Sequence, residues 1–216
     1  MKYELVVFDW DGTLLDSAGA IVRAIQAAAR DLGLAEPADD RARHVIGLGL
    51  VDALRHAVPD LPAARYGEMT DRYRHHFLSG DHELSLFDGV PALLHRLRER
   101  GHLLAVATGK SRLGLERSLD HSGLRPYFLG SRCADECHSK PHPQMLEELM
   151  QEFGQSAAST VMIGDTSHDL LMATNAGVDA LAVSYGAHPS DHLLAHRPKA
   201  CLHSVQALDE WLMKNG

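Results

Sequence analysis

Two aspartates near the N-terminus stand where a short apolar segment ends. Residues 5–8 (Leu-Val-Val-Phe) are apolar, and Asp9 and Asp11 follow them with one residue in between. Such a segment is typical of a strand that a parallel sheet buries on both faces. Burying two carboxylates at its end is costly unless a partner compensates their charge. Mg²⁺ is a natural partner, because it prefers oxygen ligands and binds through one or two carboxylates together with substrate phosphate.

A second pair of carboxylates follows another apolar segment much later in the chain. Residues 160–163 (Thr-Val-Met-Ile) predict a buried strand, and Gly164, Asp165 and Asp169 come after it. If this strand lies beside the first, Asp165 lies near Asp9 and completes an oxygen cage for Mg²⁺. Asp169 is either a further ligand, directly or through water, or an acid that the dipole at the start of a helix favours.

Two further positions could oppose the charge of a phosphate group. Thr108 and Gly109 end a third apolar segment. A hydroxyl group and exposed backbone N–H groups before a helix can hold phosphate oxygens. Lys140 lies in a loop before a predicted helix, and Lys110 competes with it for the same role. We rank Lys110 below Lys140, although lysines in loops are usually only solvated.

Helices and strands alternate over most of the chain. The apolar pattern predicts strands at 5–8, 103–107, 160–163 and, as the last strand, 180–183, with a weak candidate at 127–129. It predicts helices at 90–97, 113–119, 145–153, 167–176 and 205–212. This alternation favours right-handed βαβ units and a parallel sheet, in which ligands bind beyond the carboxyl ends of the strands. The predicted fold class is α/β, with a Rossmann-like parallel sheet as its core.

The stretch from 16 to 86 differs because it has little strand signal. Helical periodicity is present at 21–32, 51–58 and 66–77. We therefore predict an inserted α-helical cap domain at 16–86 and a catalytic core formed by 1–15 and 87–216.

Composition excludes several classes of protein. A net charge of −8 argues against nucleic-acid binding through a basic face. The cysteines Cys133, Cys137 and Cys201 provide no disulfide framework, and no second ligand pair follows Cys133 and Cys137 to complete a zinc site. No apolar run is long enough to span a bilayer, and no signal peptide is recognisable. We expect a cytoplasmic protein without a membrane partner, as a monomer or small homo-oligomer.

Four segments, in this order, resemble the motifs of the haloacid dehalogenase superfamily. They are Asp9-x-Asp11-Gly12-Thr13-Leu14-x-Asp16, Thr108-Gly109, Lys140-Pro141 and Gly164-Asp165-x-x-x-Asp169. The resemblance covers nearly the whole chain. It implies that Asp9 is a nucleophile that forms an aspartyl-phosphate and that Asp11 is the general acid and base. An aspartate at this second position favours phosphoryl transfer over carbon–halogen hydrolysis, because the dehalogenase branch lacks it.

The same resemblance implies the remaining ligands. Lys140 neutralises the phosphoryl group and the nucleophile, while Thr108, Gly109 and Gly12 contact the phosphate. The residues implied as Mg²⁺ ligands are Asp9, Asp11 through its backbone carbonyl, Asp165 and, as a further candidate, Asp169.

The predicted cap resembles the small helical (C1-type) cap of phosphoglycolate phosphatase-like members. Residues 44–50 with Gly47 and Gly49, together with Arg55, resemble a substrate-contacting cap loop, and a plain turn with an exposed Arg55 is the alternative. We expect a Mg²⁺-dependent phosphatase for a small organic phosphomonoester, with 2-phosphoglycolate as a candidate. The alternatives are a sugar-phosphate or nucleotide phosphatase, a phosphoglucomutase, and a catalytically idle binding protein on the same fold.

Overall fold

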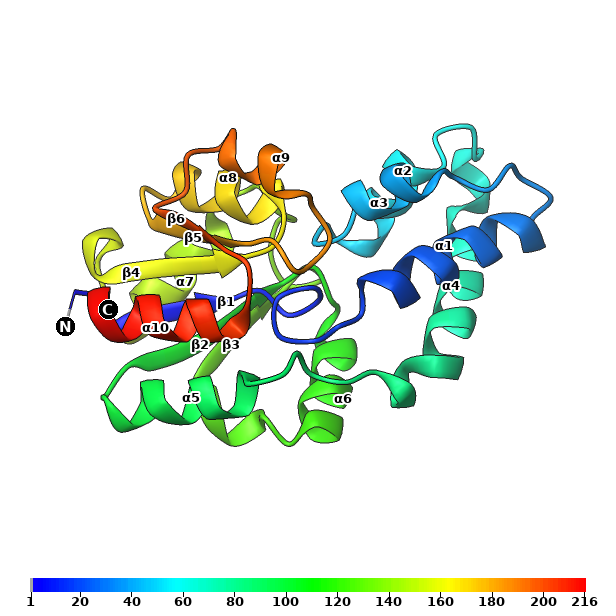
Figure 1. Ribbon diagram of the computed structural model, residues 1–216. Coiled ribbons are helices and arrows are strands. Elements are labelled where there is room, and N and C mark those ends of the chain that lie inside the picture. The colour runs from blue at the N-terminus through cyan, green and yellow to red at the C-terminus, as the bar shows by residue number, and fades with distance from the viewer. Residues whose placement is uncertain (1) are drawn as a thin grey trace.

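Six parallel strands form the centre of the computed structural model, which describes residues 2–216 (Figure 1). They are β1 (Leu5–Phe8), β2 (Leu103–Thr108), β3 (Gly130–Cys133), β4 (Thr160–Gly164), β5 (Asp179–Val183) and β6 (Ala200–Leu202). Their order in the sheet is β3-β2-β1-β4-β5-β6, and every neighbouring pair is parallel. The predicted α/β fold with a Rossmann-like parallel sheet is confirmed.

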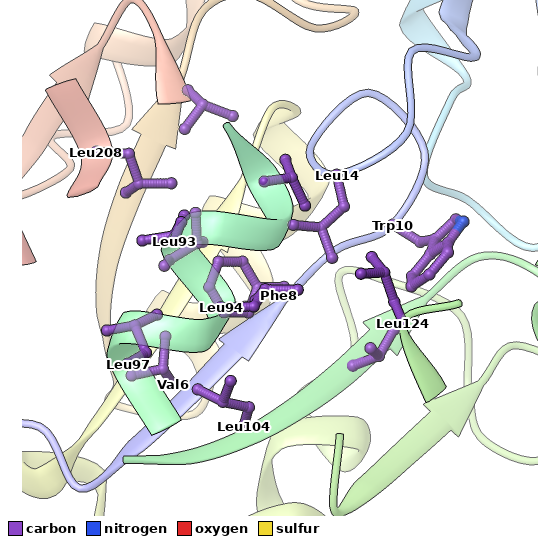
Figure 2. Packing of buried hydrophobic residues seen from close by; sticks show 14 of the residues in the cluster. Val6, Phe8, Trp10, Leu14, Leu93, Leu94, Leu97, Leu104, Leu124 and Leu208 are labelled. Atoms are coloured by element: carbon purple, nitrogen blue, oxygen red, sulfur yellow. The ribbon is translucent and has the colours of Figure 1, made fainter. Parts of the chain in front are cut away.

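Helices cover both faces of this sheet. They are α5 (Val90–Glu99), α6 (Arg112–Ser122), α7 (Gln144–Phe153), α8 (Ser167–Asn175), α9 (Ser190–Leu194) and α10 (Val205–Asn215). Val6 and Phe8 of β1 belong to the apolar cluster that α5 and α10 complete (Figure 2). Leu5 and Val7, which alternate with them, belong to the cluster that α7 and α8 complete. Because each face is covered, β1 is apolar at every position, and each buried side chain of this size contributes roughly 1.5–3 kcal/mol.

Four helices between β1 and α5 form a separate group, which we call the cap. They are α1 (Ala18–Asp31), α2 (Asp39–His44), α3 (Leu50–Ala57) and α4 (Tyr66–Gly80). Figure 1 shows the cap beyond the carboxyl ends of the strands. Its helices bury an apolar cluster of their own, to which Ile25, Leu54 and Met69 contribute. None of the helices within residues 2–216 combines the length and the apolarity that crossing a membrane requires.

The chain enters and leaves the cap through two segments that lie side by side. The N–H of Asp16 donates to the carbonyl of Ser85 at 3.0 Å, and the N–H of Phe87 donates to the carbonyl of Leu14 at 3.0 Å. These bonds tie the two connections between cap and sheet into one short antiparallel bridge. The domain boundaries at 15/16 and 86/87 stay a prediction.

The edges of the sheet differ from the prediction. The weak candidate at 127–129 is wrong, because Arg125–Tyr127 is the short 3₁₀ helix η3 and β3 begins at Gly130. The prediction that 180–183 is the last strand is also wrong, since β6 follows it. Both β3 and β6 are edge strands with few fully buried residues, so they lack the apolar run that reveals a central strand.

Two short helices were not predicted from the sequence. The helices α2 and α9 have 6 and 5 residues, too few to establish a helical period. Three further 3₁₀ helices complete the described chain: η1 (Ala63–Arg65), η2 (Asp81–Glu83) and η4 (Ala157–Ser159).

Candidate active site

Three carboxylates from two neighbouring strands meet at the carboxyl edge of the sheet. Asp9 follows β1, Asp165 follows β4, and Phe8 is in register with Ile163. One carboxylate oxygen from each of Asp9, Asp165 and Asp169 lies within 4.8 Å of the others, and all three side chains are buried. The structure therefore brings together the aspartates that the sequence placed at the ends of two separate strands.

Lys140 lies at the centre of this cluster. Its Nζ donates to Oδ1 of Asp9 at 2.7 Å and to Oδ1 of Asp169 at 2.6 Å, and its side chain is fully buried. Burial alone would lower the pKa of Lys140, but the charges of Asp169 and Asp9 outweigh it and raise this pKa above its ordinary value. Lys140 is thus a permanent cation between two carboxylates.

Asp169 has a second contact that defines its place in the helix. Its Oδ2 accepts hydrogen bonds from the hydroxyl group of Thr166 at 2.7 Å and from the N–H of Thr166 at 3.1 Å. This is a capping box at the start of α8. Both oxygens of Asp169 are therefore bound by protein donors, one by Lys140 and one by Thr166.

Asp165 is held by two donors, and Asp9 is not. The Thr13 hydroxyl donates to Oδ1 of Asp165 at 2.7 Å, and the N–H of Ala187 donates to Oδ2 at 2.7 Å. Burial and the neighbouring charge of Asp169 nevertheless raise the pKa of Asp165 to about 7. Burial raises the pKa of Asp9 well above its ordinary value, in spite of Lys140, and its Oδ2 is buried without a hydrogen-bond partner.

This donor set fits a hard cation. A buried carboxylate oxygen without a partner costs free energy, and an oxygen-seeking ion beside it removes that cost. Asp9 and Asp165 offer the oxygens, and burial, together with the neighbouring carboxylates, raises the pKa of both in spite of Lys140.

Gly12 is confined by the cluster. It has a φ of +81°, and a Cβ on it would lie 2.2 Å from Oδ2 of Asp165, so a larger residue would displace that carboxylate. The N–H of Gly12 donates to the carbonyl of Leu15 at 2.9 Å, and Gly12 does not line the cavity described below. The structure places this glycine in the turn after β1, against the Asp165 carboxylate, and its contact with phosphate stays a prediction.

Asp11 points away from the three buried carboxylates. Its Oδ1 accepts a hydrogen bond from the Ser17 hydroxyl at 2.7 Å, and its Oδ2 lies 3.1 Å from Nζ of Lys110. Both Asp11 and Lys110 line the cavity. Lys140 contacts Asp9, whereas Lys110 contacts Asp11, so the two lysines that competed for one role in the sequence occupy different places.

Thr108 and Gly109 lie beside the cavity at the end of β2. Thr108 is buried, and its hydroxyl oxygen accepts a hydrogen bond from the N–H of Lys110 at 3.2 Å. A Cβ on Gly109 would lie 2.4 Å from the carbonyl oxygen of Leu48 in the cap. Gly109 therefore allows the cap to approach the core closely.

The predicted cap loop divides into parts with different surroundings. Gly47 and Gly49 line the cavity, and the N–H of Gly49 donates to the Ser139 hydroxyl of the core at 2.8 Å. Arg55 does not line the cavity. It pairs with Asp52 at 3.4 Å and is mostly exposed, as in the alternative reading of this stretch.

A cavity of about 530 Å³ lies between the cap and the carboxyl edge of the sheet. Ligand sites typically have volumes of about 300–1,000 Å³. Asp9, Asp11, Thr108 and Gly109 line it from the core. The cap contributes mostly apolar side chains, among them Ile21, Ile25, Val45, Ile46, Tyr73 and Phe77.

The comparisons with known proteins agree with this geometry. A family model for haloacid dehalogenase-like hydrolases matches residues 6–183. The chain belongs to this family. A probable phosphatase IndB from Dickeya dadantii is 40% identical over 205 residues, which cover 90% of this chain and 87% of that protein. A 5'-nucleotidase from Pseudomonas aeruginosa is 34% identical over 214 residues, which cover 98% and 96%.

Solved structures share the fold of this haloacid dehalogenase-like hydrolase. A crystal structure described as a predicted phosphatase from Clostridium acetobutylicum has a TM-score of 0.87 at 24% identity, covering 99% of this chain and 100% of that one. The family expected from the four motifs is confirmed, and so is the expected enzyme class, a phosphoric monoester hydrolase.

Several residues at the site of this hydrolase had no role in the sequence interpretation. Ser17, Thr13 and Ala187 hold the carboxylates of Asp11 and Asp165. Thr13 stands inside the first motif, which is a usable signal, whereas the backbone N–H of Ala187 leaves none in the sequence.

Histidines at the boundary between cap and core also had no role in the sequence interpretation. The carbonyl oxygen of His44 in the cap lies 2.7 Å from Nε2 of His168 and 3.2 Å from Nε2 of His188, both in the core. His188 is buried. These contacts hold the cap against the core beside α8.

Proposed function

We propose that this hydrolase cleaves a small organic phosphomonoester in a Mg²⁺-dependent reaction with Asp9 as the nucleophile. The observation that carries the proposal is the surroundings of the Asp9 carboxylate. Lys140 binds its Oδ1 at 2.7 Å, its Oδ2 is buried without a partner, and the residue faces the cavity. A carboxylate fixed in this way can attack phosphorus without a large change in its own position.

The reaction divides into two displacements at phosphorus. In the first, an oxygen of Asp9 bonds to phosphorus as the bond to the alcohol breaks, and Asp11 donates its proton to that alcohol. In the second, Asp11 takes a proton from water while the water oxygen attacks phosphorus, which frees the Asp9 carboxylate and inorganic phosphate. Lys140 and the Thr108 hydroxyl oppose the negative charge on the phosphoryl oxygens.

Asp9, Asp165 and the backbone carbonyl of Asp11 would hold Mg²⁺, with Asp169 as a further candidate. When bound, the cation lowers the repulsion between the Asp9 carboxylate and the phosphate and stabilises the charge that develops during transfer. The partnerless oxygen of Asp9 supports this assignment.

Two substrate candidates have separate support. The resemblance of the cap loop supports 2-phosphoglycolate. The 34% identity with a 5'-nucleotidase supports a nucleoside 5'-monophosphate. The predictions of a monomer or small homo-oligomer, of a cytoplasmic location and of no nucleic-acid or membrane partner remain predictions.

A phosphate-release assay over a panel of phosphomonoesters tests this proposal. We expect turnover with Mg²⁺ and its loss in a chelator. Asp11→Asn should lower kcat/KM, which reports the first displacement, more for an alkyl phosphate than for 4-nitrophenyl phosphate, because nitrophenolate leaves without needing a proton. An equal loss of kcat/KM for both esters would contradict the role of Asp11 as the acid, and full turnover in a chelator would contradict the role of the cation.

A further inference from the structure

Two aromatic side chains of the cap face the cavity from one helix. Tyr73 and Phe77 lie four residues apart on α4, so they share one side of the helix. Their rings are stacked, with centroids 5.8 Å apart and planes at 13°. Together they form a continuous aromatic surface in the wall of the cavity, which we call the aromatic wall.

The aromatic wall stands next to the group that would protonate the leaving alcohol. Nζ of Lys110 lies 4.9 Å from the centroid of the Phe77 ring and 3.1 Å from Oδ2 of Asp11. Burial, and in addition the charge of Asp11, raise the pKa of Tyr73 far above its ordinary value. Its hydroxyl group therefore stays protonated and can donate a hydrogen bond to a ligand.

Further apolar side chains line the cavity beside the aromatic wall. Ile21 and Ile25 of α1, Val45 after α2 and Leu113 of α6 line it, and the exposed side chain of Leu113 lies at its rim. The cavity has a volume of about 530 Å³. A two-carbon acid would bury little of its apolar surface and would leave most of that surface in contact with water, so the hydrophobic contribution to binding would be small.

The cations of the cavity already have partners. Among the described residues, each lysine or arginine that lines the cavity is paired with a carboxylate. The pairs are Lys110–Asp11 at 3.1 Å, Arg117–Asp81 at 2.9 Å and Arg74–Asp71 at 3.7 Å. A second negative charge on a substrate, such as the carboxylate of 2-phosphoglycolate, would therefore compete with Asp11, Asp81 or Asp71 for these cations.

We propose that the aromatic wall, Tyr73 and Phe77, selects phosphomonoesters whose alcohol half carries a planar ring, and that 2-phosphoglycolate is a poor substrate. The ring packs on the face of the aromatic wall that lines the cavity while the phosphate reaches Asp9. This inference rests on the proposed function, since it assigns a substrate class to the same site. An aryl ester and a nucleoside 5'-monophosphate share the required ring.

The test compares kcat/KM for phenyl phosphate, uridine 5'-monophosphate, glycerol 2-phosphate and 2-phosphoglycolate. We expect both ring-bearing esters to exceed 2-phosphoglycolate, and the better of the two distinguishes a simple aryl group from a nucleoside. Phe77→Ala should lower the ratio of phenyl phosphate to glycerol 2-phosphate about tenfold, as expected for a lost aromatic contact. Tyr66→Leu is the matched control, because Tyr66 lies on the same helix and packs in the cap without lining the cavity.

A binding measurement separates the substrate class from the phosphatase activity. Phenylphosphonate, which cannot be hydrolysed, should bind more tightly than 3-phosphonopropionate in isothermal titration calorimetry, and Phe77→Ala should remove the difference. That preference without turnover of any ester would refute the phosphatase proposal and retain the aromatic wall. Equal binding of the two phosphonates, an unchanged substrate ratio in Phe77→Ala, or a preference for 2-phosphoglycolate would each overturn the inference.

Discussion

The floor and the roof of the cavity are built in opposite ways. The floor consists of Asp9, which lines the cavity, and of Asp165, Asp169 and Lys140, which lie behind it and do not line the cavity. All four are buried charges at the ends of strands or beside them. The roof is the part of the cap that lines the cavity, and it is mostly apolar. The floor is set in the sheet, whereas the roof is joined to it by one antiparallel bridge and by contacts such as that of Gly49 with Ser139.

This difference separates the reaction from the choice of substrate. Chemistry at phosphorus needs charges held at fixed distances, and strand ends provide them. Selection of the alcohol half of a substrate depends on the area and shape of the surface that contacts it. The cap helices can change that surface without moving the charged residues of the floor.

Replacing Asp9 by Asn should separate activity from stability most sharply. We expect a loss of roughly 10⁴-fold or more in kcat, because the nucleophile is removed. The free energy of unfolding in metal-free buffer should stay the same or rise, because burial raises the pKa of Asp9 and makes its charge unfavourable there. Initial rates and urea unfolding measure the two effects. Retained turnover would end the assignment of the nucleophile.

Replacing Lys140 by Met should destabilise the protein. Without Nζ, the buried carboxylates of Asp9 and Asp169 lose their shared cation, and we expect the free energy of unfolding to fall by about 3–5 kcal/mol. Lys199→Met is the control, because Lys199 pairs with Asp179 at 3.0 Å while half exposed, a type of pair that contributes about 0–1 kcal/mol. Similar losses in both variants, measured by urea unfolding, would show that the floor holds no special ion pair.

Asp165 should make the metal-free protein less stable as the pH rises from 3.8 to about 7. Burial and Asp169 raise the pKa of Asp165 to about 7, so the folded protein keeps a proton that the unfolded chain has released. His188 acts in the opposite sense, because burial lowers its pKa to about 4 and the unfolded chain gains the extra proton below 6.5.

The contribution of Asp165 to the pH dependence of stability is therefore measured by comparing the parent protein with Asp165→Asn. The free energy of unfolding of the parent protein minus that of Asp165→Asn should decline with pH by at most about 1.4 kcal/mol per unit. Saturating Mg²⁺ should reduce the decline, since the cation favours the carboxylate. Parallel pH profiles for the two proteins in metal-free buffer would show that Asp165 titrates normally.

Arg55→Ala should have the smallest effect. Arg55 is exposed, pairs with Asp52 at 3.4 Å, lies 5.7 Å from the centroid of the Tyr66 ring and does not line the cavity. We therefore expect kcat/KM to change by less than about twofold for every ester. Phe77→Ala, on the same cap, should alter the ranking of esters instead. A change of ranking in Arg55→Ala would restore the substrate contact that the sequence suggested for this residue.

The floor could be predicted from the sequence far better than the roof. Asp9 and Asp165 follow strongly apolar strands in the middle of the sheet, and parallel strands place such residues at one edge. The period of α4 puts Tyr73 and Phe77 on one side of a helix, but it does not say that this side faces Asp11. That contact depends on how the cap sits on the core, which features such as the close approach of Leu48 to Gly109 determine.

Trapping the phosphoryl group during turnover tests the central claim most directly. The protein is mixed with a ³²P-labelled phosphomonoester and Mg²⁺, quenched in acid within the first turnover, and digested for peptide mapping. We expect one hydroxylamine-sensitive label on the peptide that contains Asp9, and none in Asp9→Asn. Rapid release of phosphate without any label on that peptide, or a label on another residue, would contradict that claim.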